Sequence, residues 1–176
     1  MTHAPASTDT AVHPGPATGP GPGIGHVHLK VSDLERAVAF YRDMLGLEVQ
    51  ARYGTEAAFL GWDGYHHHLG LNTWESRGAP PAPRGHPGLF HTAFLFPDRA
   101  ALGRVVRRLV EAGVPLTGAS DHGVSEAVYL DDPDGNGIEL YRDRPRAEWP
   151  RAADGTLAMY TRRLDLDALL AEGVDA

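Results

Sequence analysis

The sequence predicts an α+β fold built from two repeated βαβββ modules. Two observations lead to this prediction. An alternating strand pattern is followed by an amphipathic helical stripe and then by three short strand patterns. The same order occurs twice, over residues of about 23–75 and 88–145. Two similar units can bury their sheets against each other, so we expect them to form a shared half-barrel with one concave surface.

The first module begins with GHVHLKV, in which His26 and His28 share one face and apolar residues share the other. Ser32 or Asp33 can cap the next helix, LERAVAFYRDML, whose apolar stripe stops at Gly46. Three short strand candidates separated by glycine-containing turns complete the module: LEVQARYG, EAAFLGWDG and HHHLGLNTW.

The second module follows WESRGAPPAPRGHPG, a connector rich in Pro and Gly that carries no hydrophobic period. It starts with the strand candidate GLFHTAFLF. Asp98 can cap AALGRVVRRLVEA, and this helical stripe ends at Gly113. Three further strand candidates follow, with PDGN as the turn between the last two: VPLTGAS, EAVYLDDPDGN and GIELYRD.

The two ends of the chain differ from the modules. Residues 1–22 consist almost entirely of Pro, Gly, Ala, Thr and Ser, which cannot bury enough apolar surface to offset their chain entropy, so we expect a disordered tail. The domain itself is expected over 23–145. Residues 146–176 are expected to form a C-terminal extension with a helix from about Leu166, and we expect no chemistry in it.

Composition narrows the class of partner. The 23 acidic and 16 basic residues give a net charge of -7 without an evident Lys/Arg run, which argues against nucleic acid or anionic lipid and favours a small molecule. Because the chain has no cysteine, any metal must be held by nitrogen and oxygen. No apolar run approaches the roughly 20 residues that span a bilayer, and no secretion signal is evident, so we expect a cytoplasmic protein.

Superimposing the two modules by their helices places His26 over His91. At the ends of the modules HLGLN falls on GIELY, so Gly70 lies over Glu139. A pseudo-twofold arrangement would therefore bring two histidines and one glutamate toward a common centre, where the fourth equivalent position has no side chain.

Two imidazoles and one carboxylate are the facial triad of non-haem Fe(II) enzymes, and they suit a divalent cation. Such a set leaves coordination positions open, which indicates catalysis, because structural metals are normally closed off by protein ligands. Each residue alone could be an ordinary hydrogen-bonded strand residue. Buried ionisable groups without a partner are costly, so three of them rarely come together by chance. Their coincidence at equivalent positions of the repeat therefore favours a metal cleft shared by the two halves of the barrel.

Two segments, GHVHLKVSDLERAVAFYRDMLGL and DDPDGNGIELY, resemble the vicinal oxygen chelate superfamily over residues of about 24–143. This superfamily includes glyoxalase I, bleomycin-resistance proteins and extradiol dioxygenases. HHHLGLNTW and SDHGVSEAVYLDDPDGNGIELY are most similar to the extradiol catechol dioxygenase branch. The resemblance implies that His26, His91 and Glu139 hold Fe(II), or alternatively Mn(II). Glyoxalase I normally presents a fourth side-chain ligand where this chain has Gly70, which favours the dioxygenase branch.

The same resemblance assigns a role to the histidine run. The HH-x-aliphatic-small-aliphatic pattern of the branch falls on residues 66–71 and implies that His67 is the acid/base that accepts a catechol proton. His68 is the rival, because strict strand alternation would put it on the same face as Gly70. An imidazole suits this work because its ordinary pKa lies near neutrality.

Two residues of the second module also match the branch. His122 resembles the histidine that contacts substrate oxygen or dioxygen, and Tyr129 resembles the tyrosine that hydrogen-bonds the catecholate. Tyr129 could equally be a core aromatic residue with its hydroxyl at the rim. The role of His28 stays open, because a histidine on this face could line the pocket or be structural.

These features predict a metal-dependent extradiol-type ring-cleaving dioxygenase that acts on a catechol-like substrate with O2. The alternatives are a glyoxalase-type metal isomerase and a metal-free small-molecule-binding resistance protein of the same fold. Many dioxygenases of this kind carry an additional pair of modules, whereas this chain has one pair, so the substrate stays open. Paired modules often dimerise, and a homodimer is therefore one of the expected states.

Overall fold

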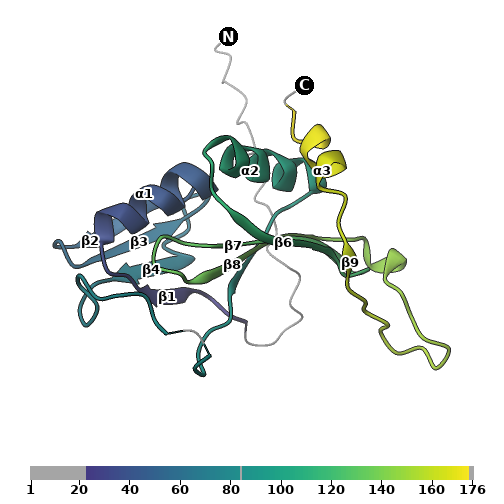
Figure 1. Cartoon of the computed structure of the whole chain (residues 1–176), viewed down its shortest axis with the longest axis horizontal. Coiled ribbons are helices and arrows are strands. Elements are labelled where there is room, and N and C mark those ends of the chain that lie inside the picture. The colour runs from purple at the N-terminus through teal and green to yellow at the C-terminus, as the bar shows by residue number, and fades with distance from the viewer. Residues whose placement is uncertain (1–22, 84, 175–176) are drawn as a thin grey trace, which may run out of the picture.

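The computed structural model describes residues 23–83 and 85–174, and the expected tail over 1–22 lies outside these residues (Figure 1). The predicted βαβββ order is confirmed in both modules, and the fold class is α+β. The first module contains β1 (Val27–Lys30), α1 (Leu34–Leu45), β2 (Glu48–Tyr53), β3 (Ala57–Gly61) and β4 (Leu69–Asn72). The second contains β5 (Thr92–Leu95), α2 (Arg99–Glu111), β6 (Leu116–Asp121), β7 (Ser125–Asp131) and β8 (Gly137–Asp143).

Helix termini follow the signals in the sequence. Asp33 caps α1 by accepting a hydrogen bond from the Arg36 backbone N–H, and Gly46 ends the helix with a φ of 77°, a left-handed conformation that glycine adopts without strain. Asp98 caps α2 in the same way through the Ala101 N–H. Of the two capping candidates for α1, the structure therefore selects Asp33.

Each module forms one sheet, with strand order β1-β4-β3-β2 in the first and β5-β8-β7-β6-β9 in the second, where β9 (Arg162–Arg163) is added by the C-terminal extension. The registers of the two sheets match: His28 pairs with Gly70 across β1 and β4, and Ala93 pairs with Glu139 across β5 and β8. His26 and His91 each lie two residues before these pairs and one residue before their strands begin. The superposition of the halves made from the sequence is thus confirmed by the hydrogen-bonded register.

The core lies between the sheets and the helices, and both long helices cover the same side of the sheets in Figure 1. Leu29 and Val31 are buried toward the helices, whereas His26 and His28 are exposed on the opposite face. The second sheet repeats this pattern, with Phe94 buried and Ala93 exposed. Strand alternation therefore puts the candidate site residues on the face that the helices leave open.

Contacts between the modules set how the two sheets meet. Phe94 of β5 packs against the rings of Tyr41 and Trp62, with ring centroids 6.4 and 5.6 Å apart. The Tyr41 hydroxyl donates a 3.0 Å hydrogen bond to Asp132 Oδ2 in the β7–β8 turn. Arg36 contacts Asp134 of the same turn at 2.7 Å. The PDGN turn predicted from the sequence thus also binds the first module.

The C-terminal extension contains a short 3-10 helix η1 (Arg146–Glu148), strand β9 (Arg162–Arg163) and helix α3 (Leu166–Glu172), which confirms the predicted helix from Leu166. Strand β9 pairs with β6, and α3 packs on α2 where Gly103 faces Gly173. A Cβ at Gly103 would lie 2.6 Å from the Leu169 carbonyl oxygen, so only glycine allows this approach. The extension is therefore part of the second sheet and of its helical layer.

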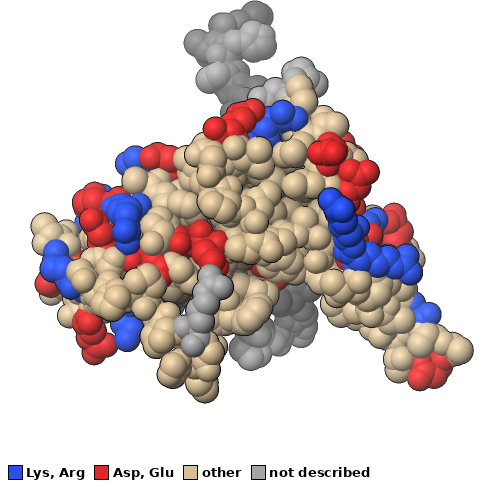
Figure 2. Space-filling view, in the orientation of Figure 1, with Lys and Arg blue, Asp and Glu red and all other residues tan. Residues whose placement is uncertain are grey.

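Charged side chains of both signs lie close together on the face shown in Figure 2. A cluster around a buried carboxylate lies within the second module: Glu126 is 4% exposed and accepts hydrogen bonds from three arginines, Arg99, Arg142 and Arg144. Within the described ranges, the helices are too short or too polar to cross a bilayer.

Candidate metal and catalytic site

The second module brings four predicted site residues into one chain of polar contacts. His91 Nε2 lies 2.8 Å from Glu139 Oε2. The other carboxylate oxygen, Oε1, lies 3.2 Å from the Tyr129 hydroxyl, which in turn lies 2.8 Å from His122 Nε2. Strand register explains the contacts, since Tyr129 pairs directly with Glu139 across β7 and β8.

Gly137 allows the His91–Glu139 contact to form. A Cβ at this position would collide with the Phe90 carbonyl oxygen and would lie 3.2 Å from His91 Cβ. The glycine therefore lets the chain before β5 lie directly against β8. His91 Nδ1 is buried and has no hydrogen-bond partner in the described part of the chain, so Nε2 carries the polar contact of this ring.

The first module gathers a second, separate cluster. The rings of His26 and His67 lie 4.5 Å apart, and His67 also packs against Phe59 at 5.1 Å. His66 Nδ1 lies 2.7 Å from His67 Nδ1, so one of these two nitrogens carries the shared proton. The histidine run thus joins the first-strand histidine of its own module.

His67 and His68 occupy different environments. The His68 ring packs against Tyr65 at 4.5 Å and Trp62 at 5.4 Å, and its Nδ1 faces the Trp62 backbone N–H at 3.4 Å. Strict alternation does not apply to this residue, because β4 begins only at Leu69. Of the two histidines, His67 is the one in ring contact with His26.

His28 explains the glycine at the position equivalent to Glu139. A Cβ at Gly70 would lie 2.8 Å from the His28 ring, so the imidazole occupies the space that a side chain would need. The ring is flanked by Trp74 at 5.7 Å and Phe59 at 5.8 Å. His28 therefore packs within an aromatic group on the open face of the first sheet.

The structure does not gather the complete predicted triad. Within residues 23–83 and 85–174, no three histidine, aspartate or glutamate side chains converge closely enough to hold a metal ion. His91 and Glu139 are in contact, whereas His26 belongs to the cluster of the first module. Register places each candidate ligand on the open face of its sheet, but it does not set the distance between the two sheets.

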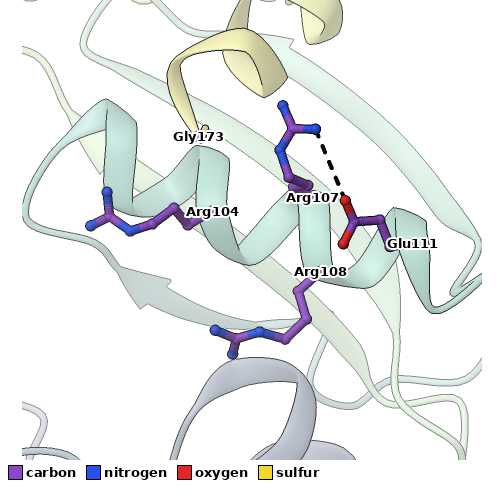
Figure 3. A pocket seen from close by; sticks show the side chains of 5 residues that line it. All are labelled: Arg104, Arg107, Arg108, Glu111 and Gly173. Atoms are coloured by element: carbon purple, nitrogen blue, oxygen red, sulfur yellow. Dashed lines mark ion pairs between the residues drawn. The ribbon is translucent and has the colours of Figure 1, made fainter. Parts of the chain in front are cut away.

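Two surface pockets are lined by none of the candidate site residues. One, of about 210 Å³, lies on α2 and is lined by Arg104, Arg107, Arg108, Glu111 and Gly173 (Figure 3). Arg107 donates to the Leu170 carbonyl of α3, and Arg108 donates to the Met44 carbonyl of α1 at 3.1 Å. These arginines hold the helices together, so we assign this pocket to helix packing. The other is lined by residues of β6 and of the extension around Leu164.

Burial and neighbouring charges keep several site groups neutral. Burial, and then the nearby His26, lowers the pKa of His67, while burial lowers the pKa of His68. Burial, followed by the charge of Glu139, raises the pKa of Tyr129 from 10.0 to about 12. Near neutral pH, His67 is therefore an unprotonated base and Tyr129 keeps its hydroxyl proton.

The extension supplies contacts that the sequence did not predict. His122 Nδ1 lies 3.1 Å from the Tyr160 carbonyl oxygen and 3.2 Å from Thr161 Oγ1. The expectation of no chemistry after residue 145 therefore misses two groups that touch a candidate catalytic histidine. A backbone carbonyl has no sequence signature, and Thr161 lies outside the repeat, so sequence patterns could not have located them.

The fold and the site together define a paired βαβββ protein with histidine and carboxylate groups on its open face. Residues 23–140 match the Glyoxalase/Bleomycin resistance protein/Dioxygenase superfamily, and the chain belongs to this superfamily. The resemblance to the vicinal oxygen chelate superfamily found in the sequence is thereby confirmed.

Similar proteins include dioxygenases. The chain is 42% identical over 152 residues to a catechol-2,3-dioxygenase of Bacillus subtilis (strain 168), covering 86% of this chain and 52% of the relative. It is 34% identical over 123 residues to biphenyl-2,3-diol 1,2-dioxygenase 3 of Rhodococcus globerulus, covering 69% of this chain and 64% of that protein. This chain thus spans less than two thirds of either relative.

A crystal structure of a glyoxalase/dioxygenase from Nostoc punctiforme has a TM-score of 0.59 and 25% identity, covering 74% of this chain and 99% of that one. Its fold likeness extends over both modules of this chain. The comparison therefore agrees with the architecture derived from strand order and register.

Proposed function

We propose that this protein is a metal-dependent extradiol-type ring-cleaving dioxygenase that acts on a catechol-like substrate with O2. The observation that carries the proposal is the contact between His91 Nε2 and Glu139 Oε2, which continues through Tyr129 to His122. The 42% identity to a catechol-2,3-dioxygenase supports the reaction class. The proposed domain is residues 23–145, with the extension packed onto it.

The separation of His91 and Glu139 suits two coordination positions of one divalent cation. Nitrogen and oxygen ligands bind such ions at about 2.1 Å, so two ligands at a right angle lie about 3 Å apart. The observed separation of 2.8 Å between His91 Nε2 and Glu139 Oε2 is close to this value. His26 is the proposed third ligand, although it is not gathered with the pair.

Fe(II), or alternatively Mn(II), is the proposed metal, because a mixed imidazole and carboxylate set suits a divalent transition metal. When bound, such an ion lowers the pKa of a coordinated phenol and offers open positions to oxygen ligands. The steps that this chain contributes itself are proton transfer and hydrogen bonding.

Tyr129 and His122 act on the side of the second module. Because its pKa is raised to about 12, Tyr129 remains a hydrogen-bond donor at neutral pH and can donate to a catecholate oxygen. His122 Nε2 lies beside that hydroxyl and is the proposed contact for substrate oxygen or dioxygen.

His67 is the proposed acid/base of the first module. Its lowered pKa keeps the imidazole unprotonated near pH 7, so it can accept a proton from a catechol hydroxyl and return it later. Its place beside His26 supports this choice over His68, whose ring packs on Trp62 and Tyr65. We expect His67→Ala to lower kcat by about 100-fold or more, in the usual range for a general base, and His68→Ala to have a smaller effect.

Metal binding is the first test. The chain is purified without metal under anaerobic conditions, and Fe(II) or Mn(II) is titrated into it. We expect one ion per chain, with affinity at least tenfold weaker in His91→Ala and in Glu139→Gln. His86→Ala, which replaces an exposed histidine of the connector, is the matched control. Wild-type protein that binds no ion would favour a metal-free resistance protein.

Turnover is the second test. The Fe(II)-loaded protein is mixed with catechol and substituted catechols, and air is then admitted. We expect a yellow ring-cleavage product with one O2 consumed per ring opened. A bound metal with no O2 uptake and no coloured product across these substrates contradicts the dioxygenase and favours a glyoxalase-type isomerase. Light scattering of the same samples tests the expected homodimer.

A further inference from the structure

The extension encloses the His122 ring from the side opposite Tyr129. Two oxygen atoms of this segment face Nδ1: the Tyr160 carbonyl oxygen at 3.1 Å and Thr161 Oγ1 at 3.2 Å. The His122 main chain takes part as well, because its carbonyl accepts a 3.3 Å hydrogen bond from the Tyr160 N–H. The two residues that contact His122 lie beyond residue 140, where the match to the superfamily ends.

The neighbouring turn is shaped to receive the extension. Gly123 has a φ of 77°, and a Cβ at this position would lie 2.6 Å from the Tyr160 ring and 2.9 Å from Pro150 Cγ. The missing side chain therefore lets Tyr160 and Pro150 pack directly on the turn. The Arg162 guanidinium lies over the Tyr160 ring, 4.2 Å from its centroid.

Sheet pairing then holds the segment in register. Arg162 pairs with Asp121 and Arg163 pairs with Ser120 across β9 and β6. Leu164, the residue that follows this strand, is 5% exposed and lies in the core. The Tyr160 carbonyl is thus held in place by two sets of contacts: its ring packs on the Gly123 turn, and the strand that follows it pairs with β6.

We propose that residues 160 and 161 are positioning residues that hold His122 as the Nδ1–H tautomer and so present its Nε2 lone pair to the site. A carbonyl oxygen only accepts hydrogen bonds, so its contact with Nδ1 requires the proton on that nitrogen. In the neutral ring, Nε2 is then an acceptor, and it faces the Tyr129 hydroxyl at 2.8 Å.

The tautomer decides how the single proton of the Tyr129 hydroxyl is shared. That hydroxyl faces two acceptors, His122 Nε2 at 2.8 Å and Glu139 Oε1 at 3.2 Å, and it can donate to only one of them at a time. With an Nε2 lone pair available, the hydroxyl can donate to His122 through the shorter contact instead of to Glu139. When it does so, Glu139 Oε1 is released for other partners. This catalytic consequence rests on the proposed function, whereas the tautomer itself does not.

Nitrogen NMR of the metal-free full chain tests the tautomer directly. Protein with ¹⁵N-labelled histidine is measured at about pH 9, well above the ordinary histidine pKa of about 6.5, and His122→Gln assigns the signals by their loss. We expect a protonated Nδ1 and an unprotonated Nε2 for His122. A wild-type spectrum dominated by the Nε2–H form overturns the proposal.

Gly123→Ala tests whether the extension sets the tautomer. The new Cβ would displace the Tyr160 ring, and losing one hydrogen bond should lower the ratio of Nδ1–H to Nε2–H by about two- to tenfold. Gly78→Ala is the control, because Gly78 has a φ of 67° with nothing within 4 Å of an added Cβ. An unchanged ratio in folded Gly123→Ala overturns the proposal.

Thr161→Val gives a second variant that keeps the glycine turn and the Tyr160 carbonyl. Removing one of the two acceptors should lower the ratio by about twofold, the small end of a hydrogen-bond contribution, and Thr161→Ser should restore it. A ratio that rises in Thr161→Val would show that the hydroxyl donates to Nδ1 and would overturn the proposal. Because these spectra need neither metal nor substrate, failure of ring cleavage leaves them interpretable.

Discussion

Tyr41→Phe should weaken the junction between the two modules without leaving a cavity. The Tyr41 side chain is fully buried, and its hydroxyl donates a 3.0 Å hydrogen bond to Asp132 Oδ2. Asp132 is only 5% exposed, and Oδ2 keeps one other donor, Asn136 Nδ2 at 2.9 Å. The substitution removes one hydrogen bond to a charged group while the ring that packs on Phe94 remains.

A hydrogen bond to a charged group contributes about 1.5–3 kcal/mol, and we expect the lower half of this range because Oδ2 retains a partner. For a protein of this size, that corresponds to a melting temperature lower by about 3–8 °C. Urea unfolding at pH 7, followed by circular dichroism, measures the change. The control is Tyr53→Phe at a tyrosine that is 69% exposed, where we expect a change within about 0.5 kcal/mol. Equal effects of the two variants would refute the reasoning.

The same variant should change the alkaline stability profile. Burial, and then the charge of Asp132, raises the pKa of Tyr41 well above its ordinary value of 10.0. The stabilisation linked to this proton is complete below about pH 10 and declines as pH rises toward the folded pKa, by up to about 1.4 kcal/mol per pH unit. Wild type should therefore lose stability faster than Tyr41→Phe above pH 10. Parallel profiles up to about pH 11.5 would contradict this linkage.

Three further predictions concern the open face and the buried charges. Gly70→Ala should displace the His28 ring, which lies 2.8 Å from the added Cβ, and cost about 1–3 kcal/mol in thermal unfolding, whereas Gly118→Ala, with its nearest atom at 3.5 Å, should cost less. Glu126→Gln should destabilise the fold by about 1–3 kcal/mol in urea, because Arg142 loses its carboxylate partner, whereas Arg99 keeps Glu172 and Arg144 keeps Asp121; a loss below about 0.5 kcal/mol would rule this out. Tyr129→Phe should remove one tyrosine that titrates near pH 12 from the ultraviolet difference titration, and loss of a group titrating near pH 10 instead would contradict the raised pKa of Tyr129.

Local elements followed the sequence closely because their signals are short-range. Alternation placed His28 of β1, and His26 just before that strand, on the exposed face of the first sheet, and the capping residues Asp33 and Asp98 precede the two long helices. The internal repeat also gave correct equivalences, since Gly70 and Glu139 occupy matching register positions. Each of these features depends on neighbours along the chain or on pairing within one module.

Choices between adjacent residues needed the structure. His67 and His68 differ by one position just before β4, where the chain is not yet a strand, so alternation could not decide between them. The structure puts the His67 ring beside His26 and the His68 ring against Trp62. The position of the His28 ring over Gly70 likewise follows only from the parallel pairing of β1 with β4.

The sequence by itself determined the superfamily, the repeated modules and which side chains face the open side of each sheet, because periodicity and register are local properties. Tertiary structure alone decided that His91 and Glu139 are in contact while His26 lies in the other cluster, because the separation of the modules depends on side chains such as Tyr41 and Phe94 at their junction. It also decided that the extension reaches His122, since that contact is made by a backbone carbonyl whose position follows from packing on Gly123.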